Sequence, residues 1–217
     1  MIRLFCGYDP REAIGFHTFV HSVVERCGEG VQITPLVGEQ RDGTNRFTYA
    51  RFSVPELCDF KGWAIYVDAC DMLLRRPLRD LMALADSTKA VQVVKHYYVP
   101  KADRKYIGTE MEAANEDYPR KNWSSVILWN CSAPAHRKNL DWLQPSDGSY
   151  LHRFKWLEDE QIGELPIEWN WLDEYGENDK ANIVHWTNGI PGFYHYRNAP
   201  HAQEWKDMAR AVNRGMA

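Results

Sequence analysis

Residues 64–67 are apolar at every position, and two aspartates, Asp68 and Asp71, follow directly. A run without polar positions favours a strand that is buried on both faces, because a strand with one face in water alternates apolar and polar residues. Such strands lie at the centre of a sheet that helices cover. We therefore expect the two carboxylates at the end of a central strand, where open α/β sheets bind ligands.

Further apolar runs alternate with segments of helical spacing. Strands are expected at residues 2–5, 32–35, 62–68, 90–94 and 125–131, and helices at 13–26, 47–57, 78–85, 156–162 and 202–214. This order predicts an α/β fold with a mostly parallel, doubly wound central sheet flanked by helices. Residues 97–122 are charged, aromatic and contain proline, so we interpret them as an excursion from the core.

The composition predicts one domain that spans residues 1–217. A net charge of −4 argues against a nucleic-acid partner. Five cysteines, odd in number and without a CxxC pair, favour a reducing compartment, and we expect a cytoplasmic protein. The chain starts with a strand-like segment rather than a signal peptide. No apolar run approaches the roughly 20 residues that span a membrane.

A second apolar run ends at His185 and continues into a turn with Thr187 and Gly189. Both runs would end at the same edge of the sheet, which brings His185 to Asp68 and Asp71. Two carboxylates and an imidazole suit a divalent ion such as Mn²⁺, and such an ion can hold a diphosphate. From the residues alone, a turn or cap role for the acids and a hydrogen-bonded core histidine remain alternatives.

Three other places carry candidate residues. Arg51 suits a diphosphate because its planar fork bonds two oxygens at once, with a surface arginine as the alternative. Residues 7–9 follow the first strand and suit a nucleoside base, or form a plain turn. Asp159 and Glu160 lie in the expected helix at 156–162, where a surface acidic pair is the alternative.

Taken in order, these segments resemble bacterial glycosyltransferases of the GT-A fold, close to glycosyltransferase family 8. The matching stretches are residues 5–9, 48–57, 66–71, 122–131, 159–161 and 184–189. The likeness covers roughly residues 2–195. Each stretch alone is modestly specific, whereas their shared order is a strong signal. The resemblance implies a GT-A, Rossmann-like fold, in which residues 133–217 complete the acceptor side and add a C-terminal helix.

The resemblance also implies a UDP-sugar donor bound through Mn²⁺ or Mg²⁺, with retention of the anomeric configuration. The acceptor would be a glycan, a lipid-linked molecule or a small molecule. Asp68 and Asp71 match the metal-binding acids of the DxD type, and His185 matches the metal-binding histidine. Arg51 matches the arginine that reaches the donor. Backbone amides near Gly189 would donate to its phosphates.

Further positions are implied in the same way. Gly7, Tyr8 and Asp9 match the nucleoside pocket, and Ser124 and Ser125 match contacts to the donor sugar.

The same likeness implies an acid below the donor sugar. Asp159 matches that acid, and either it or Glu160 would stabilise the oxocarbenium-like cation or orient the acceptor.

Two departures from the family pattern stand out. The acidic motif is D-x-x-D, one residue longer than DxD, and we expect Asp71 rather than Asp68 to be the direct ligand. No lysine follows the glycine turn, so either Lys95, Lys121 or Arg197 would replace it or the donor would be held more loosely.

Two rival functions follow from the same segments. A sugar-phosphate nucleotidyltransferase would carry a glycine-rich N-terminal loop with basic residues, whereas here Gly7 stands alone with Arg11. A non-catalytic nucleotide-sugar-binding protein of the same fold would explain the altered acid spacing.

Overall fold

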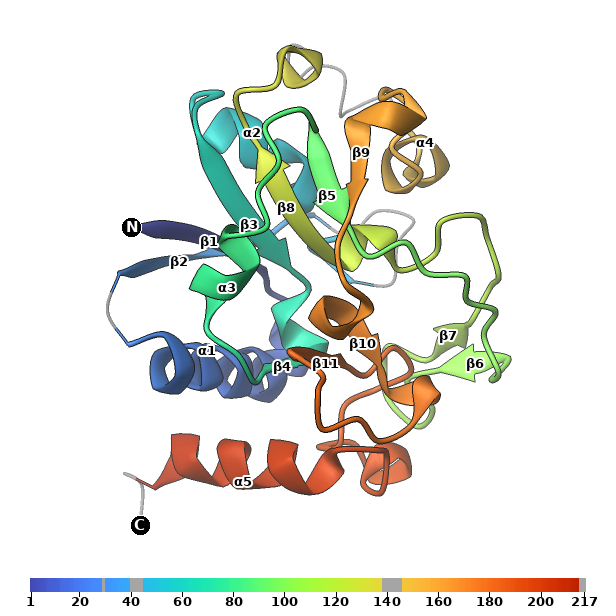
Figure 1. Cartoon of the computed structure of the whole chain (residues 1–217). Helices are drawn as coiled ribbons and strands as arrows, with labels where there is room; N and C mark the ends of the chain where they lie inside the picture. Colours follow the sequence, from blue (N-terminus) through green and yellow to red (C-terminus); the bar gives the residue numbers. More distant parts are fainter. Residues whose placement is uncertain (29, 40–44, 138–145, 215–217) are drawn as a thin grey trace.

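The apolar run 64–67 lies at the centre of the molecule, as predicted. It belongs to β3 (Trp63–Val67), in a six-stranded sheet with the order β2–β1–β3–β8–β5–β9 (Figure 1). The other strands are β1 (Ile2–Gly7), β2 (Val31–Leu36), β5 (Val91–Val93), β8 (Val126–Asn130) and β9 (Ile162–Glu164). This computed structural model describes residues 1–28, 30–39, 45–137 and 146–214.

The central sheet is mostly parallel. Strand β1 pairs in parallel with β2 and β3, and β5 pairs in parallel with β9. Only β8 runs the other way, antiparallel to β3 and β5, and all of its residues are buried. The predicted α/β class with a mostly parallel sheet is therefore confirmed. Asp68 follows the carboxyl end of β3, at the edge that the sequence indicates.

Helices cover both faces of this sheet, which explains the unbroken apolar run of β3. Ile65 and Val67 pack with residues of α1 (Ala13–Cys27) and α3 (Leu78–Met82). Ala64 and Tyr66 pack on the other face with residues of α2 (Val54–Leu57) and α4 (Gly148–His152). The terminal helix α5 (Ala202–Asn213) lies beside α1 (Figure 1).

His185 belongs to a second sheet, which corrects the prediction that it ends a strand of the central sheet. This sheet has the order β10–β11–β4, formed by β10 (Trp171–Leu172), β11 (Ile183–His185) and β4 (Met72–Leu74). Strand β4 starts directly after Asp71, and Met72 pairs with His185 in the antiparallel β4–β11 register. The two ends of the predicted metal site therefore meet through this small sheet.

Two predicted helices differ from the structure. Residues 47–57 form a 3-10 turn (Ala50–Ser53) followed by the short α2. The helix expected at 156–162 is wrong: Asp159–Gln161 is a 3-10 turn, and the next residues form β9. Pairing with β5 draws these residues into the sheet, which outweighs their helical spacing.

The excursion at 97–122 carries a small hairpin. Its strands are β6 (Arg104–Lys105) and β7 (Ala113–Ala114), which pair with each other and stand apart from both sheets (Figure 1). Among the residues described, no helix is both long and apolar enough to cross a membrane.

Helix α1 packs closely against the turn that carries the acids. A Cβ atom at Gly15 would lie 1.8 Å from the carbonyl oxygen of Cys70, so only glycine fits there. This contact fixes the turn Ala69–Asp71 from behind.

We predict that Gly15→Ala destabilises the protein, because the added methyl group must push helix and turn apart. Overpacking of this kind costs about 1–3 kcal/mol in the free energy of unfolding, measured by urea titration. Ile14→Ala, a change at an exposed position of the same helix, is the control. Equal stability of Gly15→Ala and wild type would contradict the close packing.

Candidate active site

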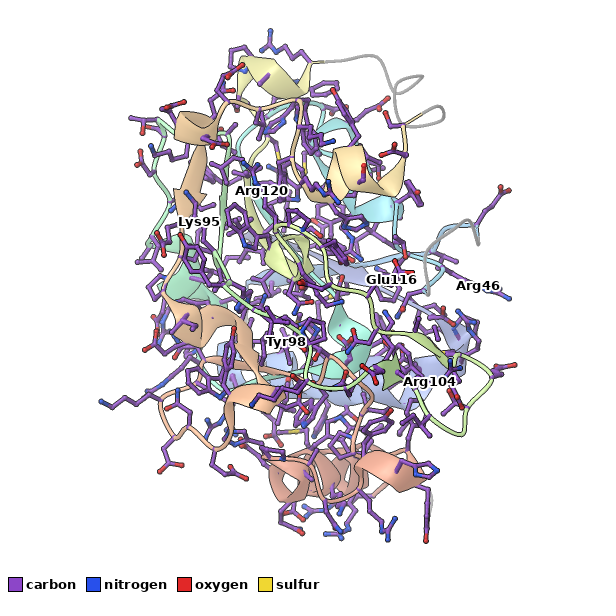
Figure 2. All side chains as sticks on the ribbon, turned by 90° about the vertical axis from the view of Figure 1, so that its right-hand side faces the viewer. Arg46, Lys95, Tyr98, Arg104, Glu116 and Arg120 are labelled. Carbon is purple, nitrogen blue, oxygen red and sulfur yellow. The ribbon has the colours of Figure 1, made fainter. Side chains whose placement is uncertain are left out.

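A cavity of about 690 Å³ opens at the carboxyl end of β3. The turn after β3, the segment before α2, the β6–β7 hairpin, the start of β8, helix α4 and the end of β11 all contribute to its wall. Figure 2 views the molecule from the side that carries the hairpin, with Arg104 and Glu116 labelled. The predicted site residues that line the cavity are Arg51, Asp68, Asp71, Ser124, Ser125 and His185.

Asp71 and His185 come together at the base of this cavity. Oδ2 of Asp71 lies 3.5 Å from Nε2 of His185, and both side chains are buried. A backbone hydrogen bond of 2.9 Å from the Trp186 amide to the Asp71 carbonyl oxygen holds the two segments in place. The structure therefore brings together two residues that are far apart in the sequence.

Asn170 fixes the proton of the imidazole. Its amide nitrogen donates to the carbonyl oxygen of Asn122 at 3.0 Å, so its side-chain oxygen is left to accept from Nδ1 of His185 at 2.9 Å. In the neutral imidazole the proton is then on Nδ1, and the lone pair of Nε2 points to Asp71. Histidines that bind metal ions are commonly oriented by such a partner.

The charges at this pair fit a cation. Burial lowers the pKa of His185, but the nearby Asp71 carboxylate outweighs burial, and the pKa is raised. Oδ1 of Asp71 is buried without a hydrogen-bond partner among the residues described. An orphaned carboxylate oxygen is costly unless a ligand satisfies it. Asp71 and His185 thus fit a divalent ion, with a carboxylate oxygen and an imidazole nitrogen as ligands.

Asp68 lines the same cavity but is paired with Arg51. One of its oxygens, Oδ1, lies 2.8 Å from the Arg51 guanidinium and accepts from the Tyr66 hydroxyl at 2.7 Å. Within the described part of the chain, no three His, Cys, Asp or Glu side chains are arranged to hold an ion together. The ion pair with Arg51 holds the carboxylate of Asp68, so convergence of all three predicted ligands on one ion stays a prediction.

Arg51 is buried, which removes the surface arginine as an alternative. Its guanidinium also donates to the carbonyl oxygens of Ser124 at 2.8 Å and Thr48 at 3.0 Å. Burial lowers the pKa of Arg51, but the Asp68 carboxylate outweighs it, and the pKa is raised. Arg51 thus joins the segment before α2 to the start of β8 and presents positive charge at the cavity wall.

Residues 7–9 lie behind the cavity rather than in its wall. Asp9 pairs with Arg11 at 2.6 Å and accepts from the Arg46 amide at 3.0 Å. The Tyr8 ring packs edge-on against Phe16, with ring centroids 5.0 Å apart. A Cβ atom at Gly7 would lie 2.5 Å from the Phe47 ring. The structure therefore shows these residues in packing and loop contacts.

The structure does not bring Asp159, Glu160 or Gly189 into the wall of the cavity. Asp159 is 77% exposed and pairs with Arg120 at 2.5 Å. Both acids precede β9 and hence lie at its amino end, whereas the cavity opens at the carboxyl ends of the parallel strands. Gly189 is pressed against the Tyr196 ring, where a Cβ atom would lie 2.5 Å away.

Other residues of the cavity wall were not predicted. Ser124 Oγ lies 2.6 Å from Nδ1 of His152 in α4. Burial and the nearby charge of Arg51 hold the pKa of His152 well below its ordinary value, so this imidazole is neutral. Asp147 caps α4 and accepts from the Tyr150 amide at 2.6 Å. An aspartate with Gly148 before an apolar position is an N-cap signal that could have placed this helix.

Comparison with known proteins adds one relative by sequence. No family model matches the chain. The chain is 35% identical to Protein CDI from Arabidopsis thaliana over 231 residues, which cover 98% of this chain and 87% of that protein.

Several solved structures share the fold. The galactosyltransferase LgtC, solved in complex with donor and acceptor sugar analogues, superposes with a TM-score of 0.65 over 97% of this chain and 96% of its own, at 14% identity. The apo form of the glycosyltransferase GlyE from Streptococcus pneumoniae TIGR4 gives 0.65 at 13% identity over 97% of this chain and 61% of its own. The bifunctional glycosyltransferase WbbM gives 0.55 at 14% identity, and the chain spans 51% of its length. At these identities the likeness establishes the GT-A glycosyltransferase fold.

We predict that Arg51→Met destabilises the protein by about 3–5 kcal/mol in the free energy of unfolding, because it leaves the Asp68 carboxylate sheltered and unpaired. Urea titration measures the change. The double variant Arg51→Met, Asp68→Asn should recover part of the loss, since it removes the unpaired charge. Additive effects of the two substitutions would show that the pair is not coupled.

Proposed function

Because the chain belongs to the family of Protein CDI and has the GT-A fold, we propose that it is a glycosyltransferase that binds its nucleotide-sugar donor through a divalent ion. One observation carries the proposal. Asp71 has an unsatisfied buried oxygen at the base of the cavity, beside a histidine whose tautomer Asn170 fixes. Structural packing alone does not account for that arrangement.

Asp71 and His185 would hold the ion, and Mn²⁺ or Mg²⁺ both accept oxygen-rich shells. The ion would neutralise the charge that develops on the leaving diphosphate. Donor phosphates and water would fill the rest of the shell, since the protein supplies two ligands. This sharing of ligands means that metal and donor bind together.

Arg51 and Asp68 would organise the donor beside the ion. Their ion pair presents a fixed carboxylate and a fixed guanidinium at the cavity wall, where sugar hydroxyls need both acceptors and donors. Ser124 and Ser125 lie in the same wall. The resemblance to family 8 supports UDP as the nucleotide and retention as the stereochemical outcome. The acceptor would be a hydroxyl of a glycan, a lipid-linked molecule or a small molecule.

Asp147 takes the role that the sequence assigns to Asp159 or Glu160. An oxocarbenium-like centre needs a carboxylate close by. Asp147 lines the cavity, and hydrogen bonds from the Tyr150 amide and from Ser149 lower its pKa, so it is ionised. Helix α4 also carries His152, which contacts Ser124. The acid therefore sits on the element that reaches the proposed sugar subsite.

The cysteines support a reducing compartment, such as the cytoplasm. All five are free, and four of them are buried. Buried free thiols behave as small apolar side chains and need no oxidising environment.

A non-catalytic nucleotide-sugar-binding protein is the second candidate. The placement of Asp159 outside the cavity favours it, because a family acid is missing from its expected position. Hydrolysis of a UDP-sugar in the presence of Mn²⁺ separates the two candidates. The hypothesis of a sugar-phosphate nucleotidyltransferase is weaker, because that enzyme would need a glycine-rich loop with basic residues for its substrate. Here Gly7 is packed against Phe47, and Arg11 is paired with Asp9.

We predict that Asp71→Asn weakens Mn²⁺-dependent binding of UDP by about 100-fold or more, since even residues that only orient metal ligands contribute 10–100-fold. Isothermal titration with UDP at fixed Mn²⁺ measures it. Asp159→Asn, the same chemical change at an exposed position, should bind like wild type. Unchanged UDP binding by Asp71→Asn would remove Asp71 as a ligand.

A second prediction concerns turnover. Asp147→Asn should lower the rate of UDP-sugar hydrolysis by about 100-fold, a loss on the scale of positioned acid or base groups, with UDP binding retained. Asp159→Asn again serves as the control, and a panel of UDP-sugars gives the substrate. If Asp159→Asn loses as much activity as Asp147→Asn, the assignment to Asp147 is wrong.

A further inference from the structure

Lys105 lines the wall of the cavity and forms no ion pair with any described residue. It belongs to β6 of the hairpin, is half-buried and lines the cavity together with Asp68 and Asp71. Among the described residues, no carboxylate oxygen lies within ion-pair distance of its ammonium group. Nζ of Lys105 lies over the ring of Tyr106, 5.6 Å from its centroid. Three N–H donors on this ammonium are therefore available to a ligand.

Of the lysines and arginine that the sequence offers for phosphate binding, Lys95 and Arg197 do not line the cavity. Lys121 does line it, but its Nζ donates to the carbonyl oxygen of Glu116 at 2.7 Å. Lys105 is the lysine of the cavity wall whose ammonium group makes no such hydrogen bond among the described residues.

The electrostatic surroundings hold Lys105 at the proposed metal end of the cavity. Burial lowers the pKa of Lys105, and the negative charge of Asp71 acts in the opposite direction. Because the Asp71 carboxylate attracts Lys105 without forming an ion pair with it, the ammonium group lies near the proposed ion site and keeps its donors for a ligand.

The hairpin is tied to the turn that follows His185. The Tyr106 amide donates to the carbonyl oxygen of Asn188 at 2.6 Å, and Asn115 donates to the Asn188 side chain at 2.8 Å. Lys105 is therefore fixed relative to the same turn that follows the proposed metal ligand. Lys105, on the β6–β7 hairpin, could therefore supply the positive charge that no lysine after the glycine turn provides.

We propose that Lys105 binds the diphosphate of the donor directly, from the side of the β6–β7 hairpin. This inference rests on the proposed function, since it assumes a nucleoside diphosphate in the cavity. An ammonium and a divalent ion on the same diphosphate would share its negative charge. Lys105 would then take part in donor binding without being a metal ligand.

Isothermal titration of Lys105→Gln with UDP and with uridine, both at saturating Mn²⁺, tests the proposal. The variant should bind UDP about tenfold more weakly or worse, as expected for the loss of a charged contact, and should bind uridine like wild type. Lys105→Arg should recover part of the affinity. Lys101→Gln is the matched control, because Lys101 is exposed on the same excursion and contacts the Glu174 carbonyl oxygen.

The other outcomes each overturn the proposal. Equal loss for UDP and uridine would mean that Lys105 supports the nucleoside or the fold rather than the diphosphate. A loss that is seen below saturating Mn²⁺ and disappears at saturating Mn²⁺ would mean that Lys105 acts on the acids. If wild type binds UDP and Lys105→Gln binds it equally well, only this inference fails. If wild type binds neither UDP, GDP nor ADP, the proposed function fails with it.

Discussion

The short pairing between β4 and β11 is the constraint on which the site depends. It joins Met72 to His185 in register, and so it sets Asp71 beside an imidazole from a distant part of the chain. The Trp186 amide closes the same junction on the Asp71 carbonyl oxygen. On the other side, α1 presses Gly15 against Cys70. Backbone contacts rather than side-chain attraction therefore hold the acid and the histidine together.

The charged groups around the cavity fit the charged ligand that we propose. Arg51, Asp68, Asp71 and His185 are all largely removed from water, and ion pairs in such places add little to stability. Among the residues described, Oδ1 of Asp71 has no hydrogen-bond partner and Lys105 has no ion-pair partner. A metal ion would satisfy Oδ1 of Asp71, and a diphosphate would pair with the ammonium group of Lys105.

Sequence patterns predicted the central part of the fold well. The unbroken apolar run of β3 requires burial on both faces, which fixes a central strand and places Asp68 at its end. The sequence predicted that His185 lies close to Asp71, but it placed His185 in the central sheet instead of the small second sheet. The reason is that an apolar run identifies a strand but not the strand with which it pairs. The ion pair of Asp68 with Arg51 could not be predicted from the sequence either, because the two residues belong to separate segments.

The periphery of the site was predicted less well, for physical reasons that differ from residue to residue. Asp159 and Glu160 follow the family order, but the parallel pairing of β9 with β5 sets them at the opposite edge of the sheet. Asp147 carried a local N-cap signal, yet nothing in the sequence placed α4 at the cavity. Lys105 lies in a segment without periodicity, and its position depends on hydrogen bonds to Asn188.

The central claim is that Asp71 and His185 bind one divalent ion together with a donor diphosphate. A crystal structure with Mn²⁺ and UDP, with anomalous scattering collected to locate the manganese, tests it most directly. We expect one anomalous peak in the cavity, about 2.0–2.6 Å from a carboxylate oxygen of Asp71, from Nε2 of His185 and from phosphate oxygens. UDP bound with the manganese elsewhere, or with Nε2 of His185 still facing Asp71 and no peak between them, would contradict it.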